Sequence, residues 1–297
     1  MNRSNSSAVN SRMSSSLPEP VTLPALWAWL AFVVAVLAAA ASVVGLLVAD
    51  RIYGKETVML ADAATAQDIV TLLVVVPLLG LMSLRARRGS LVAVLCVPGI
   101  LAFTTYNYAI YAFSIHFGPL FLVWIAVLGL SIFALVGGLA TADISTIKRR
   151  FAGRTMTFTA VFLIAVAGLF ALLWLSEIVP DMLAGKPSHS ANDWKIPTNP
   201  VHVLDLAFFL PAVITTGVLL RRRHPLGYAT VPGQLVWLAL TCLPILITPL
   251  VAAGRGHNAG WSVTIPIGVF LVTILVVLIQ LLHRLTVNPK TSAEAAR

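Results

Sequence analysis

The chain has 297 residues, of which 59% are hydrophobic and only 10% are charged. Soluble domains are about 45–50% apolar and about 25% charged, so a soluble fold of this length could not bury so much apolar surface. The formal net charge is +9, but the positive residues come in short clusters between apolar runs, without a basic stripe interleaved with aromatic residues. This pattern is typical of membrane topology, so we predict the lipid bilayer as a partner and no nucleic acid.

The first apolar run, residues 25–49, reads as a membrane anchor. A cleaved signal peptide has an apolar stretch of about 7–15 residues, and this run is longer. Its small residues also resemble a cleavage site, which remains an alternative. However, the pairs Ala38/Ser42 and Ala41/Gly45 have the spacing at which two membrane helices pack closely.

Seven further apolar runs follow, each near the roughly 20 residues that a helix needs to cross the hydrocarbon core. We predict them at residues 65–84, 90–114, 119–141, 155–178, 201–220, 230–252 and 261–283. The fold class is therefore an all-α polytopic membrane protein with about eight transmembrane helices.

The basic residues indicate the orientation. If the N-terminus is inside, fifteen of the 20 Lys and Arg residues fall in inner segments and five in outer segments. Because positive residues concentrate on the cytoplasmic side, both termini are predicted to be cytoplasmic. The short loops and the abundant Ala, Val and Leu suit a bacterial plasma (inner) membrane.

Internal similarity suggests two halves of four helices. In each half, a long outer segment precedes a short helix that has one proline and ends in an arginine cluster, and a Cys-x-Pro motif follows in the third helix. The paired features are residues 50–64 and 179–200, Pro77 and Pro211, Arg85–Arg88 and Arg221–Arg223, and Cys96–Pro98 and Cys242–Pro244. Since each half has an even number of helices, a duplication would give parallel repeats about an axis along the membrane normal. Chance matches are the alternative, because prolines and arginine clusters are common in such proteins.

This pattern gives the predicted division of the chain. It comprises a disordered, Ser-rich cytoplasmic tail (1–24), a first membrane half (25–141), a basic cytoplasmic linker (142–154), a second membrane half (155–285) and a cytoplasmic tail (286–297).

Polar residues at membrane depth are costly and point to function. The second apolar run is short, so its helix must draw in the preceding turn and place Gln67 and Asp68 at the outer boundary. Asp205 lies about 6 Å inside the sixth run, at 1.5 Å per residue. His202 is three residues earlier on the same helical face, so we expect the two side chains to touch.

The outer end of the third helix adds Tyr106, Asn107 and Tyr111. We predict one outward-facing polar cavity bounded by the second, third and sixth helices. The substrate-binding candidates are Gln67, Asp68, Tyr106, Asn107, Tyr111, His202 and Asp205. The alternatives are an interfacial aromatic belt for the tyrosines, a His202–Asp205 pair that only lowers the cost of a buried acid, and a helix N-terminal role for Asp68.

Prolines at matching positions of two halves are a pointer to a transporter site, so transport of a small molecule or ion is the leading hypothesis. A second hypothesis is an embedded enzyme or redox protein that uses His116, His202 and His257 with carboxylates. A third is a non-catalytic sensor or accessory subunit. The sequence has no His-Glu-x-x-His, P-loop or Gly-x-Ser-x-Gly motif, and we predict no metal site and no cofactor.

One stretch resembles a known family. Gln67-Asp68, Pro77, Arg87-Arg88-Gly89-Ser90 and Tyr106-Asn107-Tyr108-Ala109-Ile110-Tyr111-Ala112-Phe113 form a pattern similar to that of uncharacterised multi-pass bacterial membrane proteins. The resemblance covers about residues 60–140. It implies a fold and a membrane location, and it implies no activity.

Overall fold

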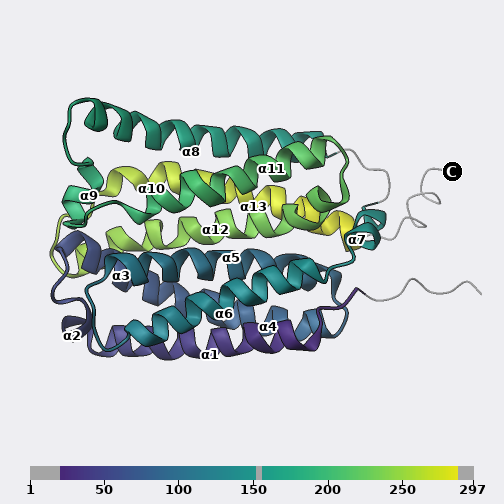
Figure 1. Cartoon of the computed structure of the whole chain (residues 1–297), viewed down its shortest axis with the longest axis horizontal. Helices are drawn as coiled ribbons and strands as arrows, with labels where there is room; N and C mark the ends of the chain where they lie inside the picture. Colours follow the sequence, from purple (N-terminus) through teal and green to yellow (C-terminus); the bar gives the residue numbers. More distant parts are fainter. Residues whose placement is uncertain (1–20, 152–155, 287–297) are drawn as a thin grey trace, which may run out of the picture.

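The computed structural model describes residues 21–151 and 156–286, and within them eight helices are long and apolar enough to cross a membrane (Figure 1). Helices are also the only regular structure in these two ranges. The protein is therefore a polytopic all-α membrane protein, as the sequence predicts. The predicted tails at residues 1–20 and 287–297, and residues 152–155 of the predicted linker, lie outside the described ranges.

The spans lie side by side along one axis (Figure 1). In chain order they are α1 (Ala25–Leu47), α3–η1–α4 (Val58–Arg87), α5 (Leu91–Ser114), α6 (Phe121–Ala140), α8 (Thr157–Leu183), α10–η2–α11 (Pro200–Arg221), α12 (Pro225–Gly254) and α13 (Thr264–Thr286), preceded by the short η3 (Trp261–Val263). All eight predicted spans are confirmed. The second and seventh begin earlier than predicted, at residues 58 and 225.

Three short helices mark the two ends of the bundle. α2 (Ala49–Tyr53) and α9 (His189–Trp194) lie at one end, which we call the α9 end. α7 (Ile144–Arg150) lies at the other end, the α7 end, where α1 begins and α4 and α11 finish (Figure 1).

The small residues of α1 form its packing face. Ala38, Ala41, Ser42 and Gly45 are all buried, and the helix packs against α3, α4 and α6. Small side chains let helix backbones approach closely in a membrane, where dispersion contacts replace the hydrophobic effect between helices. The predicted small-residue spacing therefore marks a helix–helix contact.

The second span of each half contains a proline in its interior, and a π-helical turn lies just before that proline. η1 (Thr71–Val75) precedes Pro77, and η2 (Asp205–Phe209) precedes Pro211. In both, the N–H of the residue before the proline donates to the carbonyl five residues earlier. Proline lacks an N–H and clashes with the carbonyl four residues before it, which explains the widened turn. The two turns are 134 positions apart.

The same offset of 134 recurs in the third span of each half. Ser90 caps the start of α5 and His224 caps the start of α12, each with its side chain accepting a backbone N–H. Within these helices, Val97–Gly99 and Val231–Gly233 are both Val-Pro-Gly. These matches support the hypothesis of a duplication.

The Cys-x-Pro pairing predicted from the sequence is wrong. Pro98 is the eighth residue of α5, whereas Pro244 is the twentieth of α12, so the two motifs lie at different depths. The residue that matches Pro98 is Pro232. The Cys-x-Pro resemblance is therefore a coincidence of composition.

α5 and α12 cross at the matched glycines. A Cβ placed on Gly99 would lie 2.1 Å from the carbonyl oxygen of Gly233, and a Cβ on Gly233 would lie 3.2 Å from the nitrogen of Gly99. The two backbones are thus in direct contact, which only glycine permits at the Gly99 position. This crossing joins the two halves at the centre of the bundle.

We predict that Gly99→Ala destabilises the protein by about 1–3 kcal/mol, because the new methyl group forces the central helices apart. The measurement is the thermal unfolding midpoint of the purified protein in detergent. Gly129→Ala in α6 is the control, since a Cβ there meets nothing within 4 Å. Equal midpoints for the two variants would contradict the close crossing.

Candidate functional site

A pocket of about 640 Å³ lies between the two halves. Its walls come from α3 and α5 of the first half and from α8, α10, α12 and α13 of the second. It extends from α9 to Phe103 and Trp237, each the thirteenth residue of its helix, and so reaches the middle of the spans. Binding sites of membrane proteins built from repeats commonly lie at this depth.

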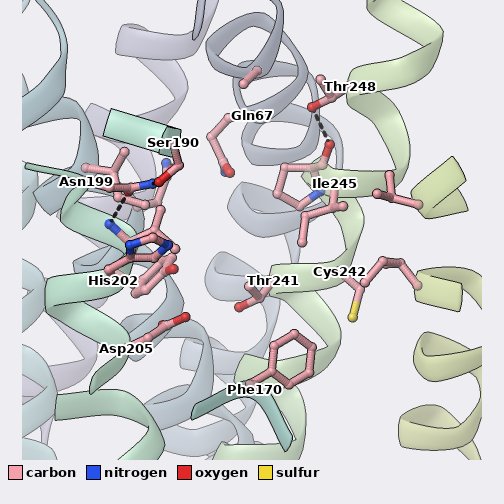
Figure 2. A pocket seen from close by; sticks show the side chains of 18 of the residues that line it. Gln67, Phe170, Ser190, Asn199, His202, Asp205, Thr241, Cys242, Ile245 and Thr248 are labelled. Carbon is pink, nitrogen blue, oxygen red and sulfur yellow. Dashed lines mark hydrogen bonds between the residues drawn. The ribbon is translucent and has the colours of Figure 1, made fainter. Parts of the chain in front are cut away.

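Polar groups occupy a small part of a mainly apolar and aromatic lining. Figure 2 shows Asn199, His202 and Asp205 on one wall, with Thr241 and Ile245 on the opposite wall. The second, third and sixth spans bound a cavity as predicted, together with three further spans, but its lining is mainly apolar and not polar as predicted. A mainly apolar pocket with a few polar groups is the usual form of a small-molecule site.

Asp205 is the first residue of η2 and is only 6% exposed. Its Oδ2 accepts a hydrogen bond of 2.8 Å from the indole Nε1 of Trp174. Its Oδ1 has no hydrogen-bond partner among the described residues. The π turn therefore holds a buried carboxylate whose Oδ1 is left without a hydrogen bond in the described part of the chain.

His202 does not pair with Asp205 as predicted. Its Nε2 lies 3.7 Å from Oε2 of Glu177, and its ring packs against that of Trp174 with the centroids 4.7 Å apart. Trp174 thus lies against both predicted residues and bonds only Asp205. Sequence spacing placed the two side chains on one face, but it could not show that α8 contributes their partners.

α9 lies over the end of the pocket. The N–H of Ser190 donates to Glu177 over 3.0 Å, and the amide of Asn199 donates to the Ser190 hydroxyl over 3.0 Å (Figure 2). Ser190, Asp193 and Trp194 line the pocket, and α9 reaches across it to contact α3. These bonds hold the loop between the fifth and sixth spans as a cover.

The predicted tyrosines are buried. Tyr106 and Tyr111 are 6% and 4% exposed, so the alternative of an interfacial aromatic belt is wrong for them. Tyr106 packs edge-on against Phe209 and Trp237, whose rings stack on each other. Both tyrosines line the pocket.

Asp68 stands apart from the other predicted residues. Gln67, Tyr106, Asn107, Tyr111, His202 and Asp205 line the pocket, and Asp68 does not. Because α3 begins at Val58, Gln67 and Asp68 also lie about 14–15 Å along the second span, deeper than the boundary position predicted from the sequence.

Asp68 belongs to a closed cluster between α1, α2 and α5. It accepts hydrogen bonds from the hydroxyls of Tyr53 (2.6 Å) and Tyr111 (3.2 Å). A Cβ on Gly45 would lie 2.1 Å from the carboxylate, so the glycine makes room for it. Burial and then the Asp68 charge raise the pKa of Tyr53 well above its ordinary value, so its hydroxyl remains a donor. The hydrogen-bond donors to Asp68 are thus supplied by other residues of the protein.

Sequence reasoning missed two further acids at the α9 end. Asp62 is buried and pairs with Arg255 (2.9 Å) and His257 (2.7 Å), which ties α3 to the loop after α12. Glu56, whose side chain is 1% exposed, pairs with His116 at 3.0 Å. No periodicity signals such pairs, because the partners are far apart in the sequence.

These pairs also separate the histidines of the metal or haem hypothesis. His116, His202 and His257 each lie beside a different carboxylate. In residues 21–151 and 156–286, no group of three or more His, Cys, Asp and Glu side chains is placed to hold a metal ion.

No family model, no curated protein and no solved structure matches this chain.

We predict that Tyr53→Phe lowers the stability of the protein by about 1–3 kcal/mol, because Asp68 loses its shorter hydrogen bond while remaining buried. Ligand binding in the pocket should not change, since Tyr53 and Asp68 lie outside it. The thermal midpoint in detergent and a binding isotherm measure the two effects. An unchanged midpoint would show that the bond contributes little.

Proposed function

We propose that the protein is a membrane transporter that binds a small, largely apolar molecule between its halves. The observation that carries this proposal is the 640 Å³ pocket at the interface of two four-helix units whose second spans are interrupted at matching positions. Interrupted helices at a repeat interface are a recurrent form of transporter site. The proposed partners are the lipid bilayer and this small molecule.

Under this proposal, the observed geometry would be one state of an alternating-access cycle. Phe103 and Trp237 lie one helical turn from Gly99 and Gly233, where the backbones of α5 and α12 touch. This contact closes the pocket toward the α7 end, while α9 covers it at the other end. In transport, the two halves would separate at this crossing and open the pocket toward the α7 end.

We further propose the bacterial plasma membrane as the location, with the α7 end cytoplasmic. Basic residues concentrate at that end, where α4, α7 and α11 finish. They are Arg85, Arg87, Arg88, Lys148, Arg149, Arg150, Arg221, Arg222 and Arg223. The positive-inside rule supports this orientation.

The orientation predicts the side on which exposed cysteines react. In a background in which Cys96 and Cys242 are replaced by Ser, Lys186→Cys should react with a membrane-impermeant maleimide in intact cells. Arg222→Cys should react only after permeabilisation. Both positions are exposed, at opposite ends of the bundle. The reverse pattern would invert the proposed topology.

Alternating access predicts that a pocket residue reacts from both sides. Thr241 lines the pocket. In the same background, Thr241→Cys should be labelled by the impermeant maleimide in intact cells and also in inside-out vesicles. The control is Leu172→Cys, since Leu172 is 67% exposed on the outer surface of α8 and faces lipid, which the reagent does not enter.

Two outcomes would contradict transport. Labelling of Thr241→Cys from one side only would fit a receptor or sensor, which binds without moving its ligand across. Labelling from neither side would mean that water does not reach the pocket, and the proposed site would then fail altogether.

A further inference from the structure

Aromatic side chains surround the polar wall of the pocket. Trp174 contacts Asp205 and His202, while Tyr106 and Trp237 pack together near the floor. Phe170 of α8 and Phe270 of α13 meet with their ring centroids 5.4 Å apart. All five line the pocket. The faces of aromatic rings carry negative potential, which attracts organic cations.

The charged groups of the lining have one sign. Asp205 and Asp193 line the pocket, and no Lys or Arg does so in the described part of the chain. His202 is the only basic side chain there, and Glu177 lies 3.7 Å from it, so any positive charge that it gains is offset. The nearby Arg255 is engaged by Asp62. The pocket therefore repels anions.

Asp205 provides the specific contact. It is more than nine-tenths buried, lines the pocket, and leaves its Oδ1 without a partner among the described residues. Buried carboxylates are costly unless they are paired, and a buried acceptor without a donor is rare in native proteins. A hydrogen-bond donor or a positive charge on a ligand would give Oδ1 of Asp205 the partner that it lacks.

We infer that the pocket binds an organic cation, in which a positively charged or protonated amine-type group lies beside Asp205 and an apolar body lies among the aromatic rings. This inference rests on the proposed function, because it names the substrate class of the same pocket. A neutral apolar ligand would leave Oδ1 of Asp205 without a donor, and an anion would meet the negative charge of Asp205 with no Lys or Arg of the described lining to bind it.

The test compares three probes of similar shape and different charge. Tetraphenylphosphonium is a cation, tetraphenylborate an anion and triphenylphosphine oxide is neutral. Equilibrium dialysis of the purified full chain against the same detergent solution measures binding, with detergent alone subtracted. We expect the cation to bind at least about tenfold more tightly than the neutral probe, and the anion most weakly.

Two matched variants test whether Asp205 causes the preference for the cation. Asp205→Asn keeps the shape of the side chain and removes its charge, and it should abolish the preference for the cation. Asp50→Asn removes an exposed charge at the same end of the bundle and should leave the preference intact. If Asp205→Asn does not fold, the comparison of the three probes on the unaltered protein still decides the inference.

The outcomes separate the two proposals. If the neutral probe binds as tightly as the cation, the charge inference is overturned while a small-molecule pocket stands. Tighter binding of the anion, binding of none of the probes, or an undiminished preference in Asp205→Asn also overturns the inference. A cation preference lost in Asp205→Asn, with Thr241→Cys labelled from one side only, would support the inference and reject transport.

Discussion

The contact of α5 with α12 at Gly99 and Gly233 sets the arrangement of the helices around it. The pocket lies on the α9 side of this contact and begins one helical turn from it, at Phe103 and Trp237. A side chain at the crossing would separate the halves along their whole length. Glycine is therefore required here for proximity, since both residues are helical and neither has a positive φ.

The pocket lies beside α8 of the second half and not beside its match α1 in the first, because the two helices carry side chains of different size. Both helices bury the same stripe when numbered 132 positions apart, as Ala28 with Ala160 and Ala35 with Ala167. On the next turns, small residues draw α1 against its neighbours, whereas large ones line the pocket from α8. The matched pairs are Ala38 and Phe170, Ala41 and Leu173, and Ser42 and Trp174. A close-packed polar cluster around Asp68 and an open site around Asp205 are thus two outcomes of related geometry.

The acids near the α9 end show how each charge is stabilised. Asp62 has an arginine and a histidine, Glu56 has a histidine, and Asp68 has two tyrosine hydroxyls. Each of these pairs joins segments distant in the sequence and fixes a loop or a short helix. Asp205 accepts a hydrogen bond from the indole of Trp174 and lines the pocket, which is why we propose that a bound cation balances its charge.

The sequence by itself determined the class of fold. The length and hydrophobicity of each span and the charge of each loop are local properties, and the bilayer imposes requirements on each of them. It also pointed to six of the residues that line the pocket, among them Gln67, Asn107 and Asp205, which are conspicuous as polar residues in apolar helices. Only the tertiary structure decided that Asp68 lies in a separate cluster and that Trp174, not His202, bonds Asp205. These outcomes depend on which helices are in contact and at what depth in the membrane. Such contacts are set by the shapes of many side chains on both helices, and a local sequence pattern does not contain this information.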